Sequence, residues 1–143
     1  MRAKIFKIRN FLLFIAILFS ISSITSCAKR MTFATSRVAP SAEGRVKIKK
    51  DKNNNYAINL KVTHLADPKR LVPPRRTYIV WMETMRNGTK NIGNLNTSSG
   101  LFSKTLKSSL NTVTPYKPIG FFITAENAIS ITYPNGEVIL RTK

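Results

Sequence analysis

The sequence predicts an all-β fold: an antiparallel, immunoglobulin-like β-sandwich of about seven or eight strands that follows an N-terminal signal peptide. Apolar and polar residues alternate with a period of two along several stretches after Cys27. No stretch in that region keeps the spacing of an amphipathic helix over three turns. Short turn sequences separate the alternating stretches, and the region is long enough for one domain.

The N-terminus has the three parts of an export signal. A basic start precedes an apolar run at 11–21, which suits a signal-peptide core and is too short to span a bilayer of roughly 30 Å. Ile24, Thr25, Ser26 and Cys27 then resemble the lipobox of bacterial lipoproteins. The resemblance implies cleavage before Cys27 and lipidation of its sulfur, which would hold the protein on a membrane of the cell envelope, inner or outer. An uncleaved anchor with an incidental cysteine is the alternative.

These features divide the chain into three parts. We expect a signal peptide at 1–26, a lipidated cysteine with a short tether at 27–31, and the sandwich at 32–143. Four of the 24 basic residues lie in the signal, which leaves 20 against six acidic residues and a net charge of +14. A charge of this size bears on partners and association rather than on the fold.

The expected strands follow the alternation. They are 45–49, 56–63, 78–82, 121–126, 128–133 and 138–140, with weaker ones at 32–38, 91–95 and 101–106. Turns are expected at 51–55, 98–100, Asn87-Gly88 and Asn135-Gly136, since Asn-Gly favours a type I′ hairpin turn. A proline-containing connection covers 65–76. The residues expected in the core are Tyr56, Ile58, Leu60, Val62, Val80, Trp81, Phe121, Ile123, Ile131 and Leu140.

The residue inventory argues against an enzyme. The only histidine, His64, falls at a strand end, where we expect it half-buried and without a catalytic role. Glu83 and Glu126 also end strands, so we expect both to face solvent. No Gly-rich phosphate loop or nucleophile elbow occurs, and one His with one Cys cannot make a usual zinc site. We therefore predict no catalytic residues, no metal and no cofactor.

Basic residues form the strongest compositional signal. They gather around the first hairpin and around the proline-containing connection, at Lys47, Lys49, Lys50, Lys52, Lys69, Arg70, Arg75 and Arg76. Such residues could bind anionic lipid, lipopolysaccharide or another polyanion. The alternative is a solvated surface that discourages edge-to-edge strand pairing. An exported protein without an aromatic stacking motif is not expected to bind nucleic acid.

A second resemblance covers about half of the chain. The runs at 78–81, 91–95 and 122–126, followed by 138–140, are similar to the extracytoplasmic domain of anti-sigma-K factors. The resemblance implies a shared β-sandwich and no catalytic residues. Asn127 replaces the usual Pro-Gly-Gly-Ser stretch, and no sigma-binding helical segment or full membrane span precedes the domain, so anti-sigma activity does not carry over.

The sequence thus predicts a lipid-anchored envelope protein with a non-enzymatic binding or sensing module, whose partner is another envelope protein. The alternative is a structural lipoprotein that binds a polyanion through its basic loops.

Overall fold

The computed structural model describes residues 28–98 and 106–143, with the backbone alone for 96–98. Its elements are β1 (Lys29–Thr32), β2 (Glu43–Lys50), β3 (Tyr56–Thr63), the 3₁₀ helix η1 (Pro68–Arg70), β4 (Thr77–Thr84), β5 (Thr89–Asn94), β6 (Asn96–Ser98), β7 (Lys107–Thr114), β8 (Pro118–Glu126) and β9 (Val138–Arg141). The lipobox residues Ile24, Thr25, Ser26 and Cys27, and the strand expected at 101–106 except for its last residue, lie outside the described residues.

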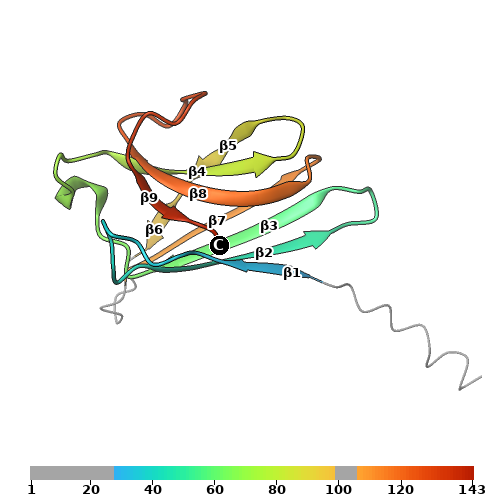
Figure 1. The fold of residues 1–143 in the computed structure, drawn as a ribbon, viewed down its shortest axis with the longest axis horizontal. Coiled ribbons are helices and arrows are strands. Elements are labelled where there is room, and N and C mark those ends of the chain that lie inside the picture. The colour runs from blue at the N-terminus through green and yellow to red at the C-terminus, as the bar shows by residue number, and fades with distance from the viewer. Residues whose placement is uncertain (1–27, 99–105) are drawn as a thin grey trace, which may run out of the picture.

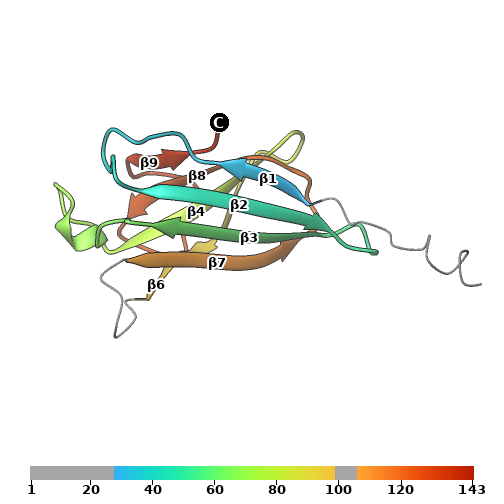
Figure 2. The same ribbon diagram turned by 90° about the horizontal axis from the view of Figure 1, so that it is seen from below.

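The strands form two antiparallel sheets packed face to face, which confirms the predicted all-β sandwich (Figures 1 and 2). The five-stranded sheet has the order β1-β2-β3-β7-β6, and the four-stranded sheet has the order β5-β4-β8-β9. The two sheets are linked from β3 to β4, from β5 to β6 and from β7 to β8. Sequence neighbours pair as hairpins at β2–β3 and β4–β5, around two of the expected turns.

The core between the sheets comes from alternate positions of their strands. Buried side chains from both sheets form one cluster that includes Ile58, Leu60, Val62, Val80, Phe121, Ile123 and Leu140, with Tyr56 partly buried against it. All eight were predicted as core residues. Burial of each large apolar side chain stabilises the fold by about 1.5–3 kcal/mol.

Trp81 and Ile131 belong to a second cluster. Ile79, Trp81 and Phe122 are buried on the opposite face of the four-stranded sheet, and Ile131 packs against them from the connection between β8 and β9. The indole of Trp81 stacks on Phe122 at 6.2 Å between ring centroids, and the Arg141 guanidinium lies 4.4 Å from the Phe122 centroid. The four-stranded sheet therefore carries an apolar cluster on each face. Trp81, which was predicted as a core residue, is fully buried in the second cluster.

The strand expected at 128–133 does not form. Residues 127–137 are an irregular connection, in which the amide of Asn91 donates to the carbonyls of Ile129 and Ile131 at 3.0 and 2.9 Å. Ile129 and Tyr133 are exposed, whereas Ile131 is partly buried. The alternation of apolar and polar residues at 128–133 therefore does not mark a strand with one buried face.

The tether expected at 27–31 also differs from the structure. Lys29, Arg30 and Met31 are the first residues of β1 and pair with β2. The weak strand expected at 32–38 therefore begins earlier and ends at Thr32, although Phe33 forms an isolated bridge with Thr142.

The two Asn-Gly turns do not have the expected type I′ geometry. Gly88 has a positive φ of 66° but Asn87 does not, and neither Asn135 nor Gly136 does. Instead, the Thr84 N–H donates to the Gly88 carbonyl, which closes a four-residue loop. The turn at 51–55 contains Asn54 at a φ of 64°, as its asparagines suggested.

Candidate polyanion-binding surface

The outer face of the five-stranded sheet carries a set of cations that strand register assembles. Residues that point away from the core alternate with Val46 and Ile48 on β2 and with Ile58, Leu60 and Val62 on β3. We call the exposed basic residues of this surface the cationic face: Arg30, Arg45, Lys47, Lys49, Lys61 and Lys107. Glu43 is the acidic residue at its edge, next to Thr63.

The cations lie in rows across the strands. One row runs from Thr32 through Arg45 and Lys61 to Ser109. The next runs from Arg30 through Lys47 to Asn59 and Asn111. Neighbouring strands are about 4.8 Å apart, so Arg45 with Lys61, and Arg30 with Lys47, are like charges held side by side.

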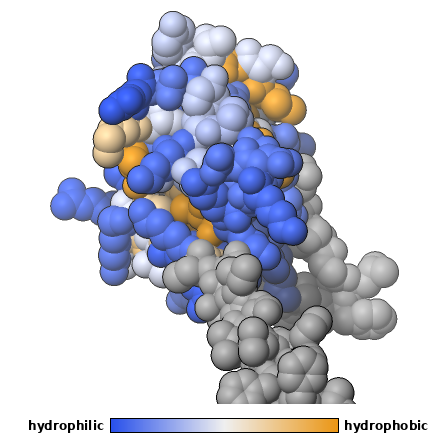
Figure 3. Space-filling view, turned by 90° about the vertical axis from the view of Figure 1, so that its right-hand side faces the viewer, coloured by the Kyte–Doolittle hydropathy of each residue, from blue (hydrophilic) through white to orange (hydrophobic). Residues whose placement is uncertain are grey.

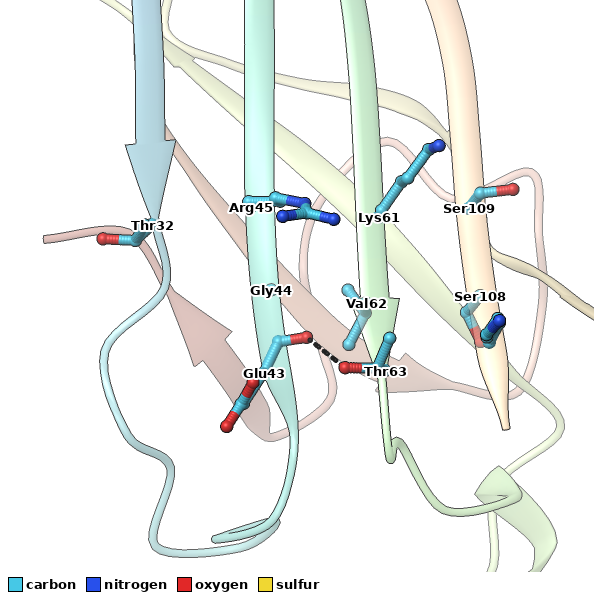
Figure 4. A pocket seen from close by; sticks show the side chains of 10 residues that line it. Thr32, Glu43, Gly44, Arg45, Lys61, Val62, Thr63, Ser108 and Ser109 are labelled. Atoms are coloured by element: carbon cyan, nitrogen blue, oxygen red, sulfur yellow. Dashed lines mark hydrogen bonds between the residues drawn. The ribbon is translucent and has the colours of Figure 1, made fainter. Parts of the chain in front are cut away.

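The surface is hollowed along the same strands. Two adjoining hollows, of about 870 and 610 Å³, share Thr32, Arg45 and Lys61. Figure 4 shows Arg45 and Lys61 lying across the sheet in the smaller hollow, with the hydroxyl of Thr63 donating to the Glu43 carbonyl at 3.5 Å below them. A ligand laid across the strands would therefore meet cationic side chains from three strands.

Most carboxylates are engaged away from the cationic face. Four of the six acids have partners elsewhere: Asp51 in the β2–β3 turn, Asp67 at η1, Glu83 with Arg141, and Glu126 inside a buried network. In the described part of the chain the one ion pair joins Arg141 and Glu83 at 2.5 Å. No cation of the face forms an ion pair with another described residue, and Glu43 is the carboxylate that lines the same hollow as Arg45 and Lys61.

The basic residues named from the sequence divide among three places. Lys47 and Lys49 lie on the cationic face, and Lys50 and Lys52 lie beside it at the β2–β3 turn. Lys69, Arg70, Arg75 and Arg76 lie in the connection between β3 and β4, at the opposite end of the sheet (Figure 1). The fold therefore does not bring the two predicted groups together.

Four cations of the face were missed as candidates. Arg30, Arg45, Lys61 and Lys107 come from four strands, and only their register places them on one surface. The available signal was the alternation of Arg45, Lys47 and Lys49 with Val46 and Ile48, which puts three cations on one side of a strand.

Glu126 corrects a prediction. Its side chain was expected to face solvent, but it is 4% exposed. Its Oε1 accepts from the Thr124 hydroxyl at 2.7 Å and from the backbone N–H groups of Asn135 and Gly136 at 3.0 and 2.8 Å. The Trp81 indole N–H donates to the same Thr124 hydroxyl at 2.8 Å. The Thr124 hydroxyl thus links the Trp81 indole to the Glu126 carboxylate, and the bonds from Asn135 and Gly136 to Oε1 position the 127–137 connection.

His64 is exposed, not half-buried. Its φ of 57° turns the chain out of the β3 alternation, so its side chain leaves the core face. The Ser41 hydroxyl donates to the His64 carbonyl at 3.5 Å. Among the described residues no group of three His, Cys, Asp or Glu side chains could hold a metal ion.

Tyr78 lines a smaller hollow of about 370 Å³ with Asp67, Arg76 and Leu95. Its hydroxyl donates to the Ala66 carbonyl at 3.0 Å. Burial, and secondarily the Asp67 carboxylate, raises the pKa of Tyr78 to about 12. The phenol is therefore protonated at neutral pH and is a poor base or nucleophile there.

Comparison with protein-family models, with curated proteins and with solved structures finds no match for this chain. In the described segments no helix has the length and apolar character to cross a membrane.

Proposed function

We propose that this chain is a lipid-anchored protein of the bacterial cell envelope whose β-sandwich is a non-enzymatic binding module for a polyanion. The observation that supports the ligand class is the cationic face, where six exposed Lys and Arg side chains from four strands surround adjoining hollows. The proposed attachment is a lipid on Cys27, and its support is the lipobox sequence Ile24, Thr25, Ser26 and Cys27.

The spacing of the cations suits an extended ligand. Outward positions along one strand recur about every 6.6–6.8 Å, so Arg45, Lys47 and Lys49 present three charges in a line. Arg guanidinium groups bind phosphate and carboxylate through paired hydrogen bonds, and Lys ammonium groups add point charges. A chain with repeated phosphates or carboxylates, such as lipopolysaccharide or an anionic polysaccharide, matches this pattern.

The test compares two triple variants of the lipidated protein in detergent. Arg45→Gln/Lys47→Gln/Lys61→Gln removes three charges from the cationic face, and Lys69→Gln/Arg70→Gln/Arg76→Gln removes three exposed charges from the far connection. The measurement is the salt concentration that elutes each protein from immobilised heparin, with wild type as reference. The first variant is expected to elute at clearly lower salt and the second near wild type. If the elution salt falls equally for both variants, heparin binding depends on net charge and not on the cationic face. A larger fall for the second variant would place the binding site at the basic residues of 69–76.

An envelope protein partner is the second candidate. Its support is two apolar side chains of the 127–137 connection, Ile129 and Tyr133, which are 54% and 79% exposed. Cross-linking in intact cells, followed by identification of the captured proteins, tests this candidate. An Ile129→Ser/Tyr133→Ser variant that captures the same proteins would contradict it. The resemblance to anti-sigma-K factors concerns the sandwich alone, and we propose no anti-sigma activity.

A further inference from the structure

One end of the sandwich brings together the start of β1 and three connections between strands. The register pairs Lys29 with Ile48, Lys50 with Tyr56, and Tyr56 with Thr114. The β2–β3 turn and the β7–β8 turn therefore lie at the end where β1 begins. The β4–β5 hairpin lies at the same end, as Figures 1 and 2 show. We call this region the anchor end and define it by Lys29, Lys50, Lys52, Arg86, Tyr116 and Lys117.

Cys27 is next to the anchor end in the chain. Ala28 alone separates it from Lys29, the first residue of β1. Two residues span at most about 7 Å, so the Cα atoms of Cys27 and Lys29 are within that distance. The tether expected at 27–31 would have allowed a longer distance between Cys27 and the sandwich. Its last three residues are instead paired with β2. If Cys27 carries a lipid, the anchor end lies at the membrane surface.

The composition of the anchor end suits an anionic surface. Its five basic side chains are all exposed. Asp51 lies at the same end, but its carboxylate accepts from the N–H groups of Asn53 and Asn55 at 2.8 Å each. Figure 3 looks onto this end: hydrophilic residues cover most of the visible surface, with hydrophobic patches between them.

Two side chains add apolar contact area beside these charges. Met85, in the β4–β5 hairpin, is 74% exposed. Tyr116 is exposed in the β7–β8 turn, with the Lys90 ammonium 5.3 Å from its ring centroid. Tyrosine rings are enriched at membrane–water interfaces, where the ring meets apolar groups and the hydroxyl meets water.

We infer that the anchor end docks against the anionic phospholipid headgroups of the membrane that holds Cys27, so that the strands lead away from the bilayer. The inference depends on the lipid anchor of the proposed function. An eight-residue strand such as β3 covers about 26 Å, so the connection with Lys69 and Arg70 lies on the side away from the membrane. The outer face of the five-stranded sheet is then roughly perpendicular to the membrane plane, and the cationic face stays accessible to a polyanion.

The test places one fluorescent label at either end of the lipidated protein. Cys27 is the only cysteine, and its sulfur would carry the lipid, so Asn53→Cys and Val72→Cys each supply one reactive thiol. Asn53 is exposed in the β2–β3 turn, and Val72 is 95% exposed at the far end. The proteins are reconstituted into vesicles whose lipids carry a headgroup quencher, made either of phosphatidylethanolamine with phosphatidylglycerol or of phosphatidylcholine alone.

Docking predicts strong quenching of the Asn53 label in the anionic vesicles only, and weak quenching of the Val72 label in both. Each basic residue near an anionic leaflet strengthens association about fivefold, so Lys50→Gln/Lys52→Gln/Lys117→Gln should lower the ratio of docked to undocked protein on the order of 100-fold. The matched control Lys69→Gln/Arg70→Gln/Arg76→Gln should leave the quenching unchanged.

Flotation of the vesicles at high salt separates the two ways to fail. A protein that does not float with them has no lipid anchor, which overturns the anchor and the docking inference together. A protein that floats, but whose Asn53 label responds neither to phosphatidylglycerol nor to the loss of the three lysines, overturns docking and leaves the anchor in place.

Discussion

Arg45 of β2 lies directly opposite Lys61 of β3 on the outer face of the five-stranded sheet. Arg30 and Lys47 repeat this arrangement on β1 and β2. Like charges placed directly opposite on neighbouring strands oppose pairing, on the scale of about 0.2–1 kcal/mol for cross-strand pairs. These pairs weaken the sheet slightly, and a polyanion bound as proposed above would neutralise both of them.

Replacing Lys61 should raise the stability of the fold and weaken heparin binding at the same time. Lys61→Thr removes one member of the Arg45–Lys61 pair and introduces a residue that favours strands. We expect the free energy of unfolding to rise by up to about 1 kcal/mol, measured by urea denaturation, while heparin elution moves to lower salt. The control Lys69→Thr removes an exposed charge from η1 and should change neither quantity clearly. Lower stability in the Lys61 variant would contradict the repulsion.

Glu126 should be replaceable by glutamine but not by an apolar residue. All three of its hydrogen bonds go to Oε1, and a glutamine carbonyl oxygen can accept them. Glu126→Leu leaves buried donors unsatisfied, which costs about 1–3 kcal/mol for each one that finds no water. Thermal unfolding of both variants makes the comparison. Equal losses in the two variants would show that the carboxylate charge, and not its acceptor oxygen, stabilises the 127–137 connection.

Gly136 should tolerate no side chain. A Cβ built at this position would lie 1.9 Å from the carbonyl oxygen of Ala125, which belongs to the backbone of β8 and cannot move freely. Gly136→Ala is expected to lower the free energy of unfolding by about 1–3 kcal/mol, as overpacking does. Asn135→Ala serves as the neighbouring control, because the Asn135 hydrogen bond to Glu126 uses the backbone N–H. A Gly136→Ala protein as stable as wild type would refute the close approach.

Tyr78 should make the free energy of unfolding fall at alkaline pH. Its pKa is about 12 in the folded state and 10 when unperturbed, so the folded protein holds the proton more tightly. Its contribution to stability is complete below about pH 10 and is lost as pH rises from there through 12. Phenolate absorbance should show one of the four tyrosines titrating late, and Tyr78→Phe should abolish that step. A late step that persists in Tyr78→Phe would assign it to another tyrosine.

The sequence was sufficient to predict strands whose alternation separates large apolar from polar residues. The predicted bounds of β3 agree with the structure at both ends. The ranges predicted for β2, β4 and β8 lie inside the observed strands, which are longer. β7 was missed because its inward positions include small polar side chains, and Ser108 and Thr114 are buried there. The strand expected at 128–133 had the right alternation but no neighbouring strand with which to pair.

The candidate surface was less accessible to sequence reasoning than the fold. Clusters of Lys and Arg along the chain favoured the loops, whereas the cationic face collects single cations from separate strands. Its composition depends on the pairing of β1 with β2 and of β3 with β7, and a shift of one residue would turn every side chain to the other face. Glu126 was misplaced for a similar reason, since its backbone partners come ten or fewer residues later in an irregular connection.

The central claim is that a polyanion binds on the cationic face, and its most direct test is an NMR titration of the isotopically labelled, detergent-solubilised protein with a short heparin oligosaccharide. We expect the largest amide shifts along β2 and β3, at Arg45, Lys47 and Lys61, with smaller ones at Arg30 and Lys107. Shifts that gather at 68–76 instead, or no saturable shifts at low salt, would contradict the claim.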